Sequence, residues 1–248
     1  QTPLARYEHD KVALNNFYSL VETLMMVSAN QYKTVIVAME LKNYKLAEIN
    51  QVLKSLLNLH IRNIFISQAP ANTLEQFYPS LAQSIYKNNM TLTEVLQVID
   101  NKMYKGESLK KSFMNRLIKS STDKKVIRYI LREIYNYDNQ DEVKVFDNAQ
   151  HVNLEHILPQ SPKENSEWFS IFKVEEEREI YTESIGNLTV LLGTKNSSGG
   201  NQDFEYKKNV YKDSAIKHNQ RLATVDNWNE KAIKNRAEKL YETFIKIW

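Results

Sequence analysis

Two short stretches of the sequence carry side chains that could activate water and hold a cation. The first, residues 154–160, places the carboxylate of Glu155 directly before the imidazole of His156, and Pro159 follows soon after. The second, residues 186–196, carries the amide of Asn187 near its start and the amide of Asn196 at its end. An imidazole can act as a general base, and oxygen ligands suit a hard divalent cation.

These groups match the needs of phosphodiester hydrolysis, which requires an activated water, a cation near the phosphate and side chains that hold both. Neighbours on a regular strand point to opposite faces, so Glu155 and His156 can share one site only if the strand ends or bends near His156. Taken singly, a Glu-His pair is a weak signal, Asn187 is typical of a turn and Asn196 of a helix cap. The prediction therefore depends on the four side chains converging around one cation.

The order of elements after residue 145 is predicted to be strand, strand, helix. Runs 151–157 and 185–192 are rich in Val, Ile and Leu and end in turn-forming residues. The acidic stretch 164–183 between them is expected to be partly helical, with a solvated face. A basic segment, 204–211, follows the second run. A last helix is expected from about Trp228, capped by Asp226 or Asn227.

Residues 1–145 are predicted to form successive helices, because their apolar residues recur at helical spacing. Thr73 with Gln76, and Thr91 with Glu94, have the spacing of capping boxes. We interpret this part as a helical scaffold or binding region without catalytic residues. The three clearest apolar stripes are Leu46-Ile49-Val52-Leu53-Leu56-Leu57, Leu92-Val95-Leu96-Ile99 and Val126-Ile127-Ile130-Leu131-Ile134.

Composition narrows the class of protein. The 248 residues are 42% hydrophobic and 25% charged, which is typical of a folded globular chain. The absence of cysteine excludes disulfides and cysteine-held zinc, and it fits a cytoplasmic protein. No stretch approaches the ~20 apolar residues of a membrane helix. A net charge of +3 is too small to indicate nucleic-acid binding by itself.

The two motifs resemble those of HNH, or His-Me finger, nucleases. Residues 155–159 resemble the D/E-H-I-x-P strand of that family, and residues 187–196 resemble its second strand and helix start. The resemblance implies that His156 is the general base and that Glu155 and Asn196 hold one divalent metal, Mg²⁺ in the first place and Mn²⁺ as the alternative. It implies that Asn187 orients the base by bonding the loop or the backbone near the histidine.

A closer resemblance is to the C-terminal nuclease domain of GmrSD-type, modification-dependent restriction endonucleases and their SspE-like relatives. It covers about residues 150–248 and includes the pattern Asn201-x-x-Phe204-x-x-Lys207-Lys208. Asn201, Lys207 and Lys208 are the candidate phosphate contacts. Full-length members carry an upstream nucleotide-using domain with a D-G-Q-Q-R motif, which this sequence lacks. The chain, which begins at Gln1, is therefore expected to be a fragment or a reduced member.

The resulting hypothesis is an α+β, mostly helical protein with a helical region at 1–145 and a ββα-metal (HNH) nuclease domain with extra C-terminal helices at 146–248. Its expected activity is metal-dependent cleavage or nicking of DNA, including modified phage DNA, in restriction or anti-phage defence. The alternative hypothesis is a non-catalytic helical interaction or DNA-binding module with a degenerate nuclease fold. A third option is an RNase or toxin-like nuclease.

Overall fold

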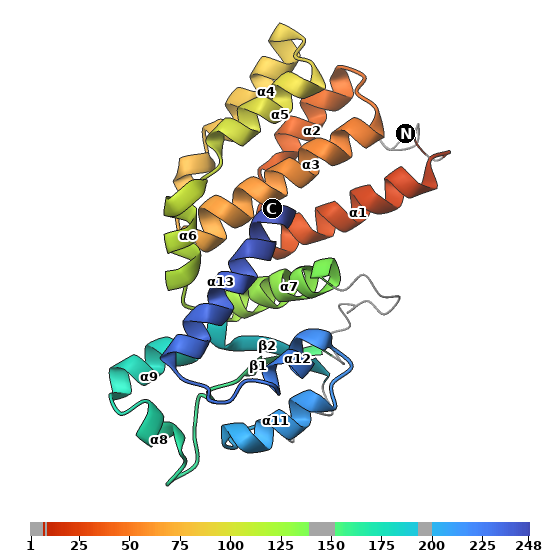
Figure 1. Cartoon of the computed structure of the whole chain (residues 1–248). Coiled ribbons are helices and arrows are strands. Elements are labelled where there is room, and N and C mark those ends of the chain that lie inside the picture. The colour runs from red at the N-terminus through yellow and green to blue at the C-terminus, as the bar shows by residue number, and fades with distance from the viewer. Residues whose placement is uncertain (1–6, 8, 139–151, 193–199) are drawn as a thin grey trace. The chain divides into compact units, whose positions relative to one another are not determined.

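The computed structural model describes residue 7 and residues 9–138, 152–192 and 200–248 (Figure 1). The chain divides into two compact units, residues 1–109 and 110–248. The sequence predicts a boundary at 145/146 instead. The difference arises because helix α7, Ser121–Asp138, packs against both strands and the last helix, which all belong to the second unit.

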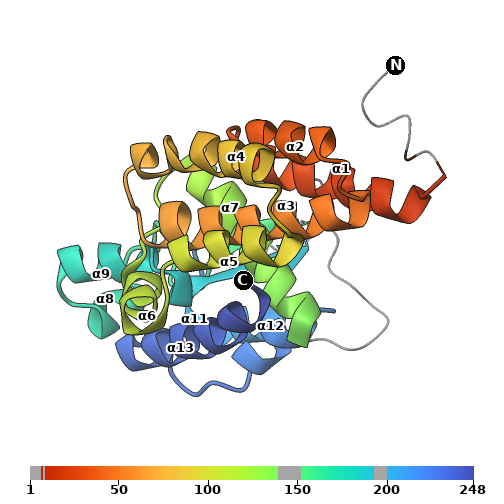
Figure 2. The same ribbon diagram turned by 90° about the horizontal axis from the view of Figure 1, so that it is seen from above.

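The first unit is a bundle of helices, as its apolar stripes predict. Helix α2 packs beside α4, and α3 packs against α1 and α5 (Figure 2). All six apolar stripe residues of α3 are buried. The elements are α1 (Lys11–Met26), α2 (Tyr32–Leu41), α3 (Leu46–His60), a π-helical turn (Ile61–Ile66), a 3₁₀ turn η3 (Ala71–Leu74), α4 (Phe77–Asn88) and α5 (Leu92–Lys102), with α6 (Gly106–Asn115) crossing into the second unit.

The helix starts agree with the sequence at one predicted cap and differ at two others. Thr91 caps α5, since its hydroxyl accepts from the Glu94 backbone N–H at 3.3 Å and its own backbone N–H donates to the Glu94 carboxylate at 2.6 Å. The capping box predicted at Thr73 is wrong, because its hydroxyl instead donates to the Pro70 carbonyl oxygen within η3. The last helix is capped by Asn229, later than predicted.

The second unit combines helices with a small sheet. Within the described residues, no helix is both long and apolar enough to span a membrane. The elements of the second unit after α6 are α7 (Ser121–Asp138), β1 (Val152–His156), α8 (Trp168–Ile171), α9 (Glu175–Thr182), a 3₁₀ turn η4 (Ile185–Asn187), β2 (Leu188–Leu192), α11 (Phe204–Lys212), α12 (Lys217–Leu222) and α13 (Glu230–Ile247).

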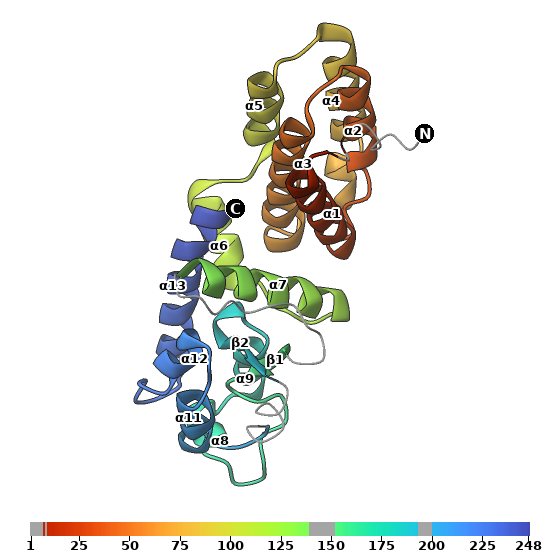
Figure 3. The same ribbon diagram turned by 90° about the vertical axis from the view of Figure 1, so that its right-hand side faces the viewer.

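Strands β1 and β2 form an antiparallel pair in which Glu155 lies opposite Thr189 and His156 opposite Leu188. The pair lies between α7 on one side and α11 on the other (Figures 1 and 3). Leu191 belongs to a buried cluster that includes residues of α11, α12 and α13. Alternation along β1 therefore directs Glu155 and His156 to different layers of the unit.

A buried polar network joins β2 to the helices around it. The Thr189 hydroxyl lies 2.9 Å from the Tyr135 hydroxyl and donates to the Asn219 amide oxygen at 2.6 Å. Arg236 of α13 donates to the Tyr135 hydroxyl and to the carbonyl oxygen of Gly186. Because buried polar groups need partners, this network fixes α7, α12 and α13 on the sheet.

His218 lies at the edge of this network. Its ring stacks on Tyr135 with centroids 4.1 Å apart, and its Nε2 lies 3.1 Å from Asp138 Oδ2. Burial lowers the pKa of His218 to about 4; Arg236 and Arg221 add to that shift, and Asp138 opposes it.

Helix α13 approaches η4 so closely that Gly186 has no room for a side chain. A Cβ at Gly186 would lie 2.2 Å from the backbone carbonyl oxygen of Ile233. We expect Gly186→Ala to lower the stability of the second unit by about 1–3 kcal/mol, the usual cost of overpacking, because a backbone atom must move. A thermal melt measures this, and an unchanged Tm would contradict the close approach.

The low pKa of His218 predicts a pH-dependent loss of stability. The unfolded chain takes up a proton near pH 6.5, whereas folded His218 does so near pH 4, so stability falls as the pH drops between these values. His218→Phe keeps a ring on Tyr135 and removes this titration. The stability of the wild type relative to the variant should therefore fall by at most a few kcal/mol from pH 7 to pH 4, since one pKa unit is ~1.4 kcal/mol. Denaturant unfolding at several pH values measures the difference. A difference independent of pH would contradict the assignment.

Candidate active site

Asn187 is the best-anchored of the predicted site residues. Its side chain is fully buried, and its Oδ1 accepts from the Leu158 backbone N–H at 2.7 Å and from Trp228 Nε1 at 2.9 Å. Its Nδ2 donates to the carbonyl oxygens of Leu158 and Thr182 at 2.9 and 3.0 Å. These four bonds use the whole capacity of the amide. Asn187 therefore cannot touch a substrate in this structure, and its side chain instead holds the segments of Leu158, Thr182 and Trp228 together.

The bonds of Asn187 fix the chain that leaves β1. Its backbone carbonyl also accepts from the Ile157 N–H at 3.0 Å. Strand β1 ends at His156, so the two residues that follow the histidine are held through Asn187. The backbone that carries the imidazole is thus fixed immediately after His156.

His156 faces a carboxylate that the sequence did not single out. Its Nε2 lies 3.5 Å from Glu183 Oε2, with the two side chains 12% and 18% exposed. Burial lowers the pKa of His156 below its ordinary value; Glu183 opposes this shift, and Lys124 and Lys207 add to it. The imidazole is therefore neutral at neutral pH, which is the form that accepts a proton.

Glu183 is itself held in place. Its Oε1 accepts from Gln160 Nε2 at 2.6 Å, and its backbone carbonyl accepts from the Ile118 N–H at 2.8 Å. Glu183 is the last residue of the acidic stretch 164–183. Because that stretch is expected to have a solvated face, the sequence alone gave no reason to choose Glu183 as a site residue. The one indication that Glu183 could belong to the site was its position four residues before Asn187, the first amide of the second motif.

Glu155 points away from His156 and forms a buried ion pair. Its Oε1 lies 2.7 Å from Lys207 Nζ, and the ammonium also donates to the His156 backbone carbonyl at 2.6 Å. The side chain of Lys207 is fully buried, and that of Glu155 is 7% exposed. Burial raises the pKa of Glu155 and lowers the pKa of Lys207, while the opposite charge of each partner opposes the shift.

The burial of Lys207 corrects its predicted role as a phosphate contact. A fully buried ammonium paired with Glu155 holds α11 against β1 and cannot reach a phosphate in this arrangement. Lys208 lies nearer the surface, but its Nζ contacts Glu205 Oε1 at 2.6 Å and the Asp226 carbonyl oxygen at 3.2 Å. Asn201 is exposed in the turn before α11. Phosphate contacts by Lys208 and Asn201 remain predictions.

Of the two predicted metal ligands, only Glu155 lies within the described residues. Asn196 lies outside the described residues, as does the whole stretch 193–199. Elsewhere, the described residues bring no three His, Asp or Glu side chains together as a metal site. A Mg²⁺ ion is often held by one or two carboxylates plus waters, so Glu155 with an amide oxygen has suitable chemistry. Lys207 already occupies one oxygen of that carboxylate, and a cation would have to share it.

Comparison with known proteins identifies the family. No curated protein matches the chain. The family model described as GmrSD restriction endonucleases, C-terminal domain, matches residues 103–243. This range includes α7, both strands, η4 and most of α13, and therefore His156, Glu183 and Asn187. Since the match covers more than half of the 248 residues, the chain belongs to the GmrSD restriction endonuclease C-terminal domain family.

Proposed function

We propose that the second unit is a metal-dependent DNA endonuclease or nickase of the HNH type. Family membership supports a nuclease role, and two paired strands followed by helix α11 are elements from which a ββα-metal site could be built. The observation that carries the proposal is the placement of His156 at the end of β1, clamped through Asn187 and facing Glu183. Modified phage DNA is the proposed substrate in a defence setting.

In the proposed reaction, His156 takes a proton from the water that attacks the phosphorus. Since Glu183 lies beside Nε2, it favours the tautomer that carries the proton on Nε2, and Nδ1 is then the proton acceptor. The carboxylate also stabilises the imidazolium that forms. Asn187 keeps the imidazole in place by holding residues 157 and 158.

Glu155 and Asn196 are the proposed ligands of a divalent metal, Mg²⁺ or Mn²⁺. When bound, such an ion neutralises charge on the phosphate and the leaving oxygen.

A second candidate function is favoured by the Glu155–Lys207 pair. A carboxylate already neutralised by an ammonium is what a degenerate site, which binds DNA without cutting it, would contain. Titration of Mg²⁺ or Mn²⁺ into the protein with non-cleavable DNA separates the two. Metal binding that is weakened by Asn196→Ala supports the nuclease. Undetectable metal binding, together with no cleavage of DNA or RNA, supports the binding module.

Replacing His156 should remove most of the activity. We expect His156→Ala to lower plasmid nicking in the presence of Mg²⁺ or Mn²⁺ by roughly 10²–10⁴-fold, the usual contribution of a general base. His9→Ala, at an exposed histidine of the first unit, is the matched control and should nick like the wild type. If His156→Ala protein with an unchanged Tm cuts as well as the control, His156 is not the base.

Glu183 is expected to act through His156. Glu183→Gln keeps an oxygen for Gln160 but removes the charge beside the imidazole. We expect kcat to fall by roughly 10–100-fold, the usual cost of losing a group that orients a catalytic side chain, with KM unchanged. Glu179→Gln, at an exposed carboxylate of α9, serves as the control. A change in KM alone would show that Glu183 contributes to DNA binding instead.

A further inference from the structure

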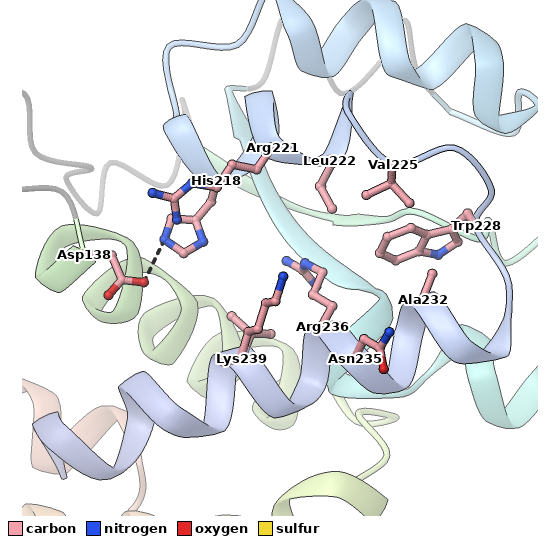
Figure 4. Close-up of a pocket in the computed structure, with 11 residues that line it drawn as sticks. Asp138, His218, Arg221, Leu222, Val225, Trp228, Ala232, Asn235, Arg236 and Lys239 are labelled. Atoms are coloured by element: carbon pink, nitrogen blue, oxygen red, sulfur yellow. Dashed lines mark ion pairs between the residues drawn. The ribbon is translucent and has the colours of Figure 1, made fainter.

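The second unit contains a pocket whose lining residues do not include His156, Glu183 or Asn187. It has a volume of about 310 Å³ and lies between α12, α13 and the end of α7 (Figure 4). Its size is at the lower end of the range for small-molecule sites. None of its lining residues is among the groups assigned above to catalysis or metal binding.

One part of the pocket is cationic. Arg221 reaches it from α12, and Arg236 and Lys239 extend from α13 toward α12 (Figure 4). Among the described residues, Arg221 and Lys239 have no ion-pair partner, and Arg236 donates to two neutral oxygens, those of Gly186 and Tyr135.

A single carboxylate lines the described part of the pocket. Asp138 faces His218, and it also accepts from the Thr243 hydroxyl at 3.1 Å. The pocket is therefore lined by three cationic side chains and one carboxylate, and that carboxylate already contacts His218 and Thr243. Burial and the nearby guanidinium groups keep His218 neutral at neutral pH. The pocket thus has an excess of positive charge, which suits an anionic ligand.

The other part of the pocket is apolar. Figure 4 shows Leu222, Val225 and Trp228 together on the side away from Asp138. The side chain of Trp228 is held in the core through its bond to Asn187 and its contact with Phe204. Trp228 and Leu222 are 1% and 3% exposed, so they close this part of the pocket, and the partly exposed Val225 and Ala232 provide its accessible apolar surface. A planar base can pack against apolar side chains of this kind. Inorganic phosphate would leave this surface unused.

We propose that this pocket binds a nucleotide, with its phosphate on Arg221, Arg236 and Lys239 and its base against Val225 and Ala232. The nucleotide is either free or part of a nucleic-acid strand. The proposal does not rest on the nuclease assignment, because the pocket shares no residue with the His156 site. The two sites are nevertheless connected, since Trp228 and Arg236 bond the neighbouring residues Asn187 and Gly186.

The test is calorimetric titration of the full chain with deoxyadenosine monophosphate, deoxyadenosine, inorganic phosphate and a short oligodeoxyadenylate. The mononucleotide or the oligonucleotide should bind at least about tenfold more tightly than phosphate or nucleoside. Binding of the mononucleotide identifies a site for free nucleotides. Binding of the oligonucleotide alone identifies a site for a strand.

Variants locate that binding. Arg221→Ala with Lys239→Ala removes two exposed cations and should weaken nucleotide binding at least about tenfold, whereas Lys212→Ala with Lys246→Ala, an equal loss of charge at exposed positions outside the pocket, should not. Val225→Phe fills the apolar part without changing the charge and should also block binding. Equal affinity for phosphate and nucleotide, equal binding by both double variants, or no binding of any probe would overturn the proposal.

Discussion

The candidate site depends on one buried amide. Asn187 is the last residue of η4, and its four side-chain hydrogen bonds connect it to the segment after β1, to the end of α9 and to the segment before α13. Loss of this side chain would leave buried backbone groups of Leu158 without partners, which costs about 1–3 kcal/mol for each group. The same bonds fix the direction in which the chain leaves His156. The stability of the unit and the geometry of the candidate site therefore rest on the same side chain, which is completely buried.

A second constraint operates on the other side of β1. The ammonium of Lys207 contacts both the Glu155 carboxylate and the His156 backbone carbonyl, so α11 is attached to the strand at the two motif residues. Removing either partner of a buried ion pair leaves an uncompensated charge, at a typical cost of 3–5 kcal/mol. The pair thus attaches the helix that follows the sheet to β1, in addition to the apolar packing of Phe204 and Tyr211. Burial is the main cause of the lowered pKa of His156, and the ammonium of Lys207 lowers that pKa further.

The sequence could predict most of the elements and a strand that ends near His156, but not all of the side chains that contact the two motif residues. Apolar periodicity located the helices, and the stripes of α3 and α7 are buried as expected. The motif residues placed Asn187 near the loop after His156, where the structure has it. Glu183 and Lys207 were missed or misassigned for the same physical reason: charged residues in charge-rich segments are usually solvated, and their burial depends on tertiary contacts between segments far apart in the sequence. The division of the chain after Leu109 likewise follows from the packing of α7, which no local pattern encodes.

The Glu155–Lys207 pair also decides between the two proposed functions. If the carboxylate is to hold a divalent ion, the ammonium must share it or move, and like charges on one carboxylate repel. A bound phosphate would reduce that repulsion, because its negative charge offsets both cations at once. A catalytic site of this kind would therefore bind metal weakly alone and more strongly with DNA. In a degenerate site the ion pair would persist whether or not DNA is present, since no divalent cation would compete with the ammonium for the carboxylate.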